Sequence, residues 1–210
     1  MYKRQVRILT WKKEFNYSAI NNFAVREARG EYLLFLNNDV EIITENWLEE
    51  MLQLCQQKDV GMVGAKLYYP DDTIQHAGVV VGLGGVAAHV LCKLPRDAEG
   101  YMGRLRCVQE ISAVTAACMM VKTSVFKAVG GFDEELKVAF NDIDLCMKVR
   151  KYGVKIVFTP YAELYHYESK SRGMEDTPEK QLRFSREVNC FRRKWERELL
   201  KGDPSVSYTH

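Results

Sequence analysis

The most constraining feature of this chain is a short apolar run that stops at two amides and an acid. Residues 33–36 read Leu-Leu-Phe-Leu and are followed at once by Asn37, Asn38 and Asp39. A continuous apolar run, unlike an alternating one, is typical of a strand buried on both faces, and such strands occur mainly in parallel sheets. We therefore predict a buried strand whose carboxyl end carries polar side chains.

Helical and strand-like patterns alternate along the rest of the chain. One helix is predicted over residues 16–29, with Ser18 as its N-cap, and a second helix is predicted to begin after Thr44 as its N-cap. Two more helices are predicted over residues 142–153 and 178–200. Strands are predicted over residues 6–9, 60–69, 111–121 and 154–159, where Pro160 ends the last one. This order indicates one α/β domain, with a Rossmann-like, mostly parallel sheet flanked by helices.

Composition excludes several classes of protein. With 47% apolar and 28% charged residues, the chain has the composition of a soluble globular domain rather than of a disordered tail or a coiled coil. The net charge of +2 predicts no general attraction to nucleic acid. The six cysteines are scattered without a CxxC pair, which favours reduced thiols in a cytoplasmic protein over a disulfide scaffold.

The basic C-terminal helix is interpreted first as a solvated face. Its Phe191 and Trp195 support a weaker hypothesis, in which the helix makes a peripheral contact with an anionic membrane surface. The protein would then act in the cytoplasm, at the inner face of the membrane.

The polar groups after residues 33–36 are the first candidate site. In open α/β sheets, ligands bind beyond the carboxyl ends of the strands. The side chains of Asn37, Asn38 and Asp39 offer hard oxygen ligands, which suit Mg²⁺ or Mn²⁺ carrying a diphosphate. The alternative is that these three residues are only turn chemistry, and spacing alone does not decide between the two.

Asp142 and Asp144 form a second acidic cluster, at the start of a predicted helix. Capping and complementation of the helix dipole explain acids at this position without any further function. The same dipole favours the ionised carboxylate, which can accept a proton, so the functional interpretation is a general base.

His166 follows a predicted strand and is the third candidate. A lone histidine is more often structural than a ligand. However, Ser169, Lys170, Ser171 and Arg172 follow on a glycine-ended loop, and cations and hydroxyls of this kind bind phosphate groups.

Two further patterns are weaker. Residues 82–87 match the GxGxxA pattern of dinucleotide sites, but Pro95 interrupts the full helix that such a site needs. Four side chains have the chemistry of zinc ligands without the spacing of a tetrahedral site: His76, His89, Cys92 and Cys107.

Taken together, these residues resemble the family 2 glycosyltransferases with the GT-A fold, in their bacterial polysaccharide and rhamnosyltransferase-like branch. The resemblance runs from about residue 15 to residue 195 and rests on the order and spacing of blocks that are weak alone. The blocks are residues 21–39, 74–78, 112–118, the Gly-Gly-Phe-Asp-Glu turn at 130–134, 141–145 and 166–173.

The resemblance implies a role for each matching position. Asp39 stands in the family's DxD-type motif and His166 matches a histidine that often completes the metal site, so both are expected to hold Mn²⁺ or Mg²⁺. Asp142 takes the place of the catalytic base. Donor contacts are expected from Asn37, Asn38, Lys170 and Arg172, and acceptor contacts from Gly131, Phe132, Asp133 and Glu134.

Two acids of the family pattern are amides in this chain. Asn37 replaces the usual first acid of the DxD-type motif, and Asn141 replaces the glutamate before the base. The metal's anionic shell is therefore expected to be thinner, with more of the coordination left to His166.

The implied activity is that of a metal-dependent, inverting glycosyltransferase of polysaccharide biosynthesis. It would move a sugar from a nucleoside-diphosphate sugar to a hydroxyl of a glycan or a lipid-linked acceptor. One base and no carboxylate nucleophile are expected, in contrast to the carboxylate pair of glycosidases. The alternative is a non-catalytic remnant of the fold that binds an acceptor or a partner; nucleic-acid binding is not expected.

The family's first two strands and their nucleotide-binding aspartate have no match here, so we expect an N-terminally truncated GT-A domain with weak or no activity alone. Residues 1–178 would form this partial domain, and residues 179–210 its C-terminal amphipathic helix and tail. Residues 33–36 would then be an edge strand. That strand would pair either with residues 6–9 or with a second chain in a homodimer.

Overall fold

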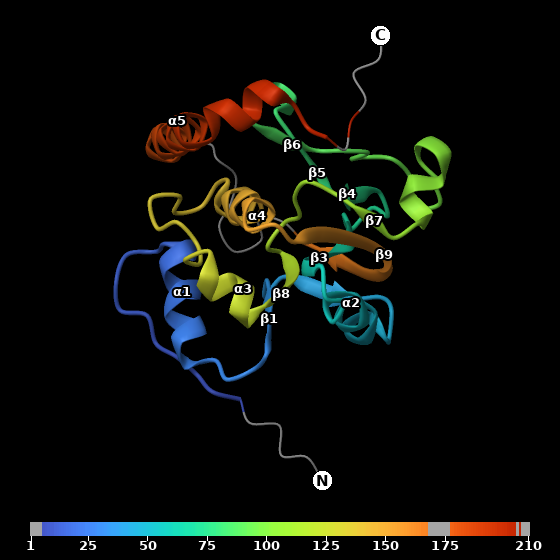
Figure 1. The fold of residues 1–210 in the computed structure, drawn as a ribbon, viewed down its shortest axis with the longest axis horizontal. Coiled ribbons are helices and arrows are strands. Elements are labelled where there is room, and N and C mark those ends of the chain that lie inside the picture. The colour runs from blue at the N-terminus through green and yellow to red at the C-terminus, as the bar shows by residue number, and fades with distance from the viewer. Residues whose placement is uncertain (1–5, 168–176, 205, 207–210) are drawn as a thin grey trace.

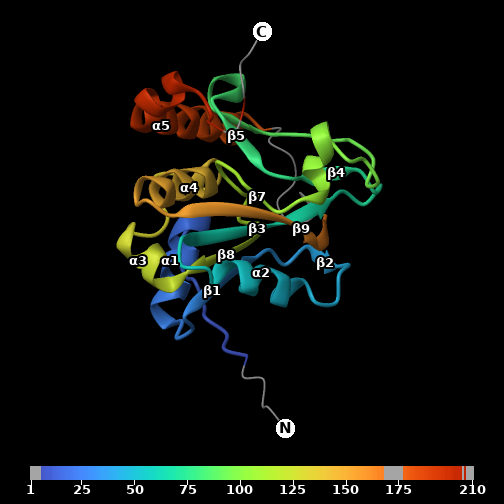
Figure 2. The same cartoon turned by 45° about the vertical axis from the view of Figure 1, so that its right-hand side comes forward.

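The computed structural model describes residues 6–167, 177–204 and 206. A central sheet carries helices on both faces, and a two-stranded sheet lies beside the C-terminal helix (Figures 1 and 2). The elements are α1 (Tyr17–Glu27), β1 (Tyr32–Leu36), β2 (Val40–Ile42), α2 (Trp47–Cys55), β3 (Val60–Tyr68), β4 (Ile74–His76), β5 (Val79–Val81), β6 (Ala87–His89), β7 (Gln109–Glu110), β8 (Cys118–Lys122), α3 (Thr123–Ala128), α4 (Asn141–Lys151), β9 (Lys155–His166) and α5 (Pro178–Lys201).

The central sheet is mixed, so the prediction of a mostly parallel sheet is wrong. The strand order is β1-β8-β3-β9-β2, with β4 beside β3 and β7 beside β9. Of the described pairs in this sheet, β3 with β9 is parallel and the others are antiparallel. The prediction of burial on both faces also fails for β1, in which Leu33 and Phe35 are buried, Leu34 is partly buried and Leu36 is 41% exposed. An apolar run does not report the direction of the neighbouring strand, which explains the error in the sheet.

The strand directions still bring several carboxyl ends together. Since β8 runs antiparallel to both β1 and β3, and β3 runs parallel to β9, the strands β1, β3 and β9 all point the same way. Their carboxyl ends therefore lie at one edge of the sheet, which is the edge where the sequence places its polar residues.

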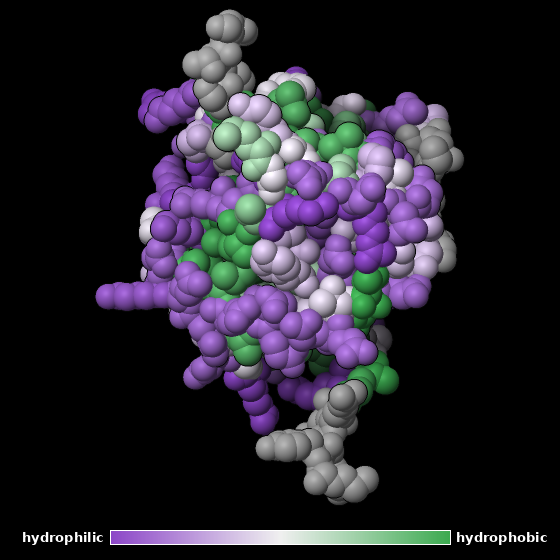
Figure 3. Space-filling model, turned by 90° about the vertical axis from the view of Figure 1, so that its right-hand side faces the viewer, coloured by the Kyte–Doolittle hydropathy of each residue, from purple (hydrophilic) through white to green (hydrophobic). Residues whose placement is uncertain are grey.

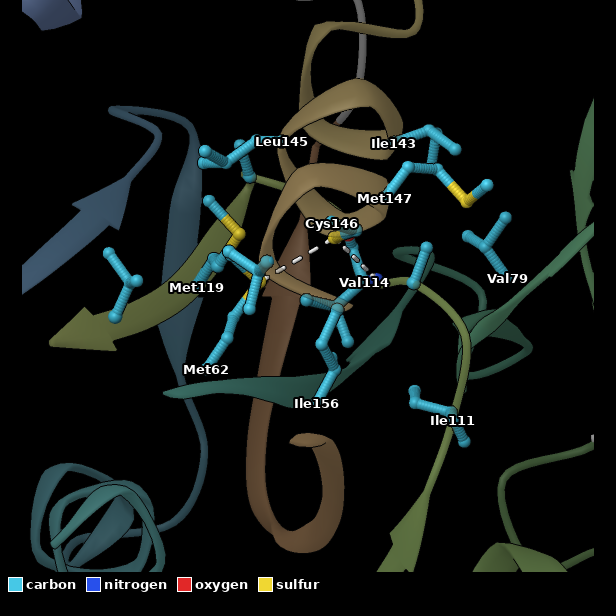
Figure 4. Close-up of a cluster of buried hydrophobic side chains, with 14 of the residues drawn as sticks. Met62, Val79, Ile111, Val114, Met119, Ile143, Leu145, Cys146, Met147 and Ile156 are labelled. Atoms are coloured by element: carbon cyan, nitrogen blue, oxygen red, sulfur yellow. Dashed lines mark hydrogen bonds between the residues drawn. The ribbon is translucent and has the colours of Figure 1, made fainter. Parts of the chain in front are cut away.

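Both faces of the sheet are buried. Side chains alternate along β3, so that Met62 packs in the cluster beneath α4 and Val63 packs against Met51 of α2 on the opposite face. Figure 4 shows Cys146 of α4 pointing into the first cluster, with its Sγ 3.5 Å from both the Met62 Sδ and the Val114 carbonyl oxygen. This packing fixes the start of α4 against the sheet.

The predicted edge strand is confirmed, because in the described structure β1 pairs with β8 alone. The predicted strand over residues 6–9 is wrong. Val6 and Ile8 are 85% and 89% exposed, and Figure 3 shows apolar residues on the surface at the lower end of the molecule. An apolar segment becomes a strand only when another strand pairs with its backbone, and residues 6–9 have no such partner among the described strands.

β9 continues past Pro160, where we predicted its end. The register with β3 shifts at this point: Gly64 pairs with Phe158, and Lys66 pairs with Glu163. Such an irregularity accommodates proline, because the missing N–H is not needed in the ladder there. The continuation of β9 brings His166 opposite Val40 of β2.

The predicted helices are all present, although two caps differ. Asn16, and not Ser18, caps α1: its side chain accepts a hydrogen bond from the Ala19 amide, whereas the Ser18 hydroxyl donates to the Leu136 carbonyl. Asn46 precedes α2 in place of Thr44.

The predicted strand over residues 111–121 is shorter than expected, since β8 begins at Cys118 and the buried residues before it are irregular. Within the described part of the chain, no helix combines the length and the apolar character needed to cross a membrane.

Candidate functional site

Residues 37–39 cross the carboxyl edge of the sheet, because they connect β1 and β2, which lie at opposite ends of the strand order. Hydrogen bonds hold the crossing at both ends. The backbone N–H of Asn37 donates to the Ala117 carbonyl at 2.9 Å, and the backbone N–H of Tyr167 donates to the Asp39 backbone carbonyl at 2.8 Å. Asn38 is exposed at the turn between them. The polar segment therefore lies where open α/β sheets bind ligands.

Asp39 and His166 meet at this edge although they are far apart in sequence. The His166 Nε2 lies 3.3 Å from the Asp39 Oδ1, and the Asn37 Nδ2 lies 3.1 Å from the same ring nitrogen. Both side chains are mostly buried, with 11% of His166 and 14% of Asp39 exposed. The Asp39 Oδ1 is itself buried and accepts no hydrogen bond from the described residues.

These two side chains fit a divalent cation. A buried carboxylate oxygen that accepts no hydrogen bond, next to an imidazole nitrogen, is a site that a cation would complete. Mg²⁺ is usually held by one or two carboxylates together with waters and substrate phosphates. The described residues contain no cluster of three or more His, Cys, Asp or Glu side chains, so waters or a bound diphosphate would supply the remaining ligands.

Two further histidines, His76 and His89, form a pair close to His166. The His76 Nδ1 lies 2.9 Å from the His89 Nδ1, and the two rings meet edge to face. Burial, together with the nearby rings of His89 and His166, lowers the pKa of His76 well below its ordinary value of 6.5. No third His, Cys, Asp or Glu side chain joins this pair within the described residues.

Asp142 caps the segment that leads into β8. Its Oδ2 accepts a hydrogen bond from the Ala116 amide at 3.2 Å, and its Oδ1 accepts one from the Ile143 amide at 2.8 Å. The Tyr17 hydroxyl donates to the Ala116 carbonyl at 3.2 Å, and burial followed by the charge of Asp142 raises the pKa of Tyr17.

The segment that leads into β8 also connects Asp142 to Asp39 and His166. Ala116 is held by Asp142, and the next residue, Ala117, accepts the hydrogen bond from Asn37. Asp142 therefore lies along the same edge of the sheet as Asp39 and His166.

Asp144 does not share this edge. It is fully buried, and its Oδ1 accepts a hydrogen bond from the Trp195 Nε1 at 2.8 Å. It also forms ion pairs with Lys194 at 2.7 Å and with Lys148 at 3.2 Å. Asp144 therefore joins α4 to α5, and the two acids of the sequence cluster have separate environments.

The turn predicted to contact the acceptor is partly a core element. Phe132 is buried, and its ring lies 4.9 Å from that of Phe35. The Asn22 side chain bonds both the amide and the carbonyl of Phe132. Gly131 has φ +68°, and a Cβ there would lie 2.7 Å from the Asn22 Oδ1, so this position requires glycine.

The other two residues of the turn are more accessible. Asp133 pairs with Lys194 on α5, and Glu134 is exposed while its carbonyl accepts a hydrogen bond from Asn16. Lys170 and Arg172, the predicted donor-binding cations, lie outside the described residues. The roles of all these residues stay predictions.

Sequence reasoning missed Gln75. It is buried in β4 and contacts both the ring and the main chain of His166. A single glutamine belongs to no chemical motif, so only its place in the block 74–78 singled it out, without a role. Only the folded structure, in which two hydrogen bonds join Gln75 to His166, shows this contact.

Comparison with known proteins places these features in a family. A model of the glycosyltransferase-like family matches residues 3–187. Protein y4gI of Sinorhizobium fredii is 58% identical over 193 residues, which are 91% of this chain and 21% of that protein. The O-antigen biosynthesis protein RfbC of Myxococcus xanthus is 42% identical over 172 residues, which are 81% of this chain and 14% of that protein.

This chain therefore spans about a fifth or less of the curated relatives that it matches over most of its length. A shorter stretch of 62 residues is 36% identical to an N-acetylglucosaminyl-diphospho-decaprenol L-rhamnosyltransferase of Mycobacterium tuberculosis, and covers 30% of this chain and 20% of that protein. The predicted relation to rhamnosyltransferases is confirmed.

Two solved structures share the fold. The mannosyltransferase PcManGT from Pyrobaculum calidifontis, in complex with GDP-Man and Mn²⁺, has a TM-score of 0.57 at 16% identity, covering 89% of this chain and 45% of that one. GalNAc-T7 with UDP, GalNAc and Mn²⁺ has a TM-score of 0.59 at 13% identity, covering 80% of this chain and 33% of that one. The predicted GT-A-like α/β fold is confirmed, and the chain belongs to the glycosyltransferase-like family, as a family-2-like protein related to RfbC and to rhamnosyltransferases.

Proposed function

We propose that this domain belongs to a metal-dependent, inverting glycosyltransferase, which moves a sugar from a nucleoside-diphosphate sugar to a hydroxyl of a glycan or a lipid-linked acceptor. The observation that carries the proposal is the buried Asp39 Oδ1 beside the His166 Nε2 at the carboxyl edge of the sheet. RfbC is named for O-antigen biosynthesis, and PcManGT was solved with a nucleotide sugar and Mn²⁺, which supports the same class of reaction here.

On the donor side, Asp39 and His166 would hold the cation, with Asn37 and Asn38 next to the diphosphate. A divalent cation supplies positive charge for the leaving diphosphate. Lys170 and Arg172 are proposed to add further charge to the same group, because leaving phosphate oxygens are stabilised by preorganised cations.

On the acceptor side, Asp142 would take the proton of the attacking hydroxyl. A carboxylate has about four lone-pair positions, and two of those of Asp142 accept backbone amides, so the group can still accept a proton. The hydroxyl oxygen bonds to the anomeric carbon on the face opposite the leaving diphosphate. This single displacement inverts the anomeric centre. Asp133 and Glu134 are proposed to contact the acceptor, on a turn shaped by Gly131 and Phe132.

The proposal is tested by calorimetric binding of a panel of nucleoside diphosphates to the chain, with and without Mn²⁺. We expect binding to require Mn²⁺, and the Asp39→Ala variant to lose the Mn²⁺-dependent part. The matched control is Asp59→Ala, an exposed turn acid just before the amino end of β3, at the opposite edge of the sheet. Nucleotide binding that is the same with and without Mn²⁺, or that survives in Asp39→Ala, would contradict a metal-dependent donor site.

A second candidate function is supported by the hydrogen bonds of Asp142. Both of its oxygens accept backbone amides, as in simple capping, and amides stand at Asn37 and Asn141 where the family pattern has acids. These features favour a non-catalytic domain that binds an acceptor glycan or a partner. Glycan binding without any release of nucleoside diphosphate from a panel of sugar donors would select this alternative.

A further inference from the structure

Gln75 contacts His166 at two points. Gln75 is 6% exposed in β4, and its Oε1 lies 2.7 Å from the His166 Nδ1. Its Nε2 donates to the His166 carbonyl oxygen at 3.2 Å. A carbonyl oxygen can only accept, so the end of the amide that faces it must be the NH₂ group. The oxygen end of Gln75 must therefore face the imidazole.

This orientation determines which ring nitrogen carries the proton. The Gln75 Oε1 can only accept, so the His166 Nδ1 must donate and hence carries hydrogen. In the neutral ring the Nε2 then has a lone pair. The contact with Asn37 agrees, because an amide Nδ2 at 3.1 Å from the Nε2 can donate to a lone pair and would oppose an N–H group there.

The Nε2 and the Asp39 Oδ1 are then two electron-pair donors 3.3 Å apart. Without a hydrogen on the ring nitrogen, no hydrogen bond joins them, which explains why the buried Oδ1 accepts none from the described residues. Two such atoms repel each other, and a cation bound to both turns this repulsion into attraction.

We infer that Gln75 is a positioning residue, which holds His166 in the Nδ1–H tautomer and so presents the Nε2 lone pair, together with Asp39, to a divalent cation. The cation would displace the Asn37 side-chain NH₂ group, which donates to the same lone pair in this structure. The inference rests on the proposed function for the identity of the cation. Gln75 acts through His166, as residues behind metal-binding histidines commonly do by accepting the hydrogen of the second ring nitrogen.

The first test needs no substitution at Gln75. Long-range ¹H–¹⁵N spectra of the metal-free chain at about pH 8, where an unperturbed imidazole is neutral, show which nitrogen of each ring is protonated. The chain has four histidines, and the His166→Asn variant identifies the signals of His166 by their loss. We expect the Nδ1 of His166 to be protonated and its Nε2 unprotonated. A ring with hydrogen on the Nε2, alone or on both nitrogens, would overturn the inference.

The second test removes the contact. In Gln75→Leu we expect signals of the Nε2–H tautomer to appear, and the affinity for Mn²⁺ alone, measured by paramagnetic resonance, to fall about ten- to a hundredfold. Gln75→Glu keeps an acceptor for the Nδ1 hydrogen and should retain the wild-type tautomer. Gln57→Leu, on the exposed turn after α2, is the control for the loss of an amide.

The outcomes separate the inference from the proposed function. An unchanged tautomer in folded Gln75→Leu would refute the role of Gln75. A protonated Nδ1 in the wild-type chain that binds no Mn²⁺ would support the positioning by Gln75 and refute the metal-dependent function.

Discussion

Asp142 and Asp144 stand two residues apart in the first turn of α4, yet they belong to different parts of the molecule. Asp142 is half-buried at the carboxyl edge of the sheet and accepts hydrogen bonds from backbone amides. Asp144 is fully buried and binds the side chains of Trp195, Lys194 and Lys148. Positions i and i+2 of a helix point in different directions, so adjacent acids can serve the site and the core separately.

The difference shows how burial divides two chemically identical groups. Each oxygen of Asp142 accepts one backbone amide, which leaves lone pairs for the proton of the proposed acceptor hydroxyl. The Oδ1 of Asp144 contacts Trp195 and Lys194 and so holds α5 onto α4, and its Oδ2 forms an ion pair with Lys148 within α4. A substitution at the first position should change chemistry, and one at the second should change stability.

The largest effect is expected from Asp142→Asn. The amide cannot take the proton of the acceptor hydroxyl, so the transfer rate should fall a hundredfold or more, as general-base removal does. Stability should change by no more than about 1 kcal/mol, since the site is at the surface edge. Initial rates and denaturant unfolding measure the two effects. Glu49→Gln, an exposed acid in the first turn of α2, is the control. Full transfer activity in Asp142→Asn would remove the contrast and exclude Asp142 as the base.

Asp144→Ala should have the next largest effect, and on stability alone. Its removal leaves the ammonium groups of Lys194 and Lys148 without their buried counter-charge, and we expect a loss of about 3 kcal/mol in the free energy of unfolding. Urea denaturation followed by circular dichroism measures the loss.

The matched control for Asp144→Ala is Asp59→Ala, which breaks an ion pair with Lys155 at 2.8 Å on the exposed surface. Exposed pairs contribute little, so this variant should unfold like the wild type. Equal stability of both variants would show that burial does not distinguish the Asp144 cluster.

Trp195→Phe sharpens the comparison by removing one contact of Asp144 and keeping an aromatic ring. The lost indole donor leaves a buried carboxylate oxygen with one hydrogen bond fewer, at a cost of about 1–2 kcal/mol. Trp11→Phe is the control, since its indole donates to the Glu14 carbonyl at an exposed site. If Trp195→Phe is as stable as Trp11→Phe, the ion pairs of Asp144 alone account for the stabilising contact between α4 and α5.

The smallest effect concerns pH. Burial by itself would lower the pKa of Lys194, but its contacts with Asp133 and Asp144 outweigh burial and raise that pKa above the ordinary 10.5. A raised pKa in the folded state means that the stabilisation is complete below pH 10.5 and is lost as the pH rises through the higher folded value. The wild type and Lys194→Met should therefore differ in their free energy of unfolding by a constant amount below pH 10.5, and this difference should narrow only above it. Denaturation curves of both proteins, measured in parallel across this pH range, test the expectation. A difference that narrows at neutral pH would contradict this assignment.

Much of the fold could be predicted because local patterns carry it. The apolar run before Asn37 predicted the strand β1, although only one of its faces is buried, and the apolar stripe with Phe191 and Trp195 predicted α5. Failures came where pairing decides the outcome. Residues 6–9 have the composition of a strand without a partner, and Pro160 is tolerated in β9 because the register shifts beside it.

The candidate site divides in the same way. Asp39, Asp142 and His166 were identified from residue type and order, because an acid after a strand or at a helix start is visible locally. Gln75 was not, because its importance depends on two contacts with a residue far along the chain.

The sequence by itself determined the helices α1, α2, α4 and α5, the strands β1 and β3 and the chemical character of the residues at their ends, since these depend on neighbours within a few positions. Only the tertiary structure decided the direction of β8, the crossing of residues 37–39 and the separate environments of Asp142 and Asp144. These depend on which distant segments exclude water together. Burial between segments far apart in the chain is a property of the packed molecule and leaves no periodic pattern in the sequence.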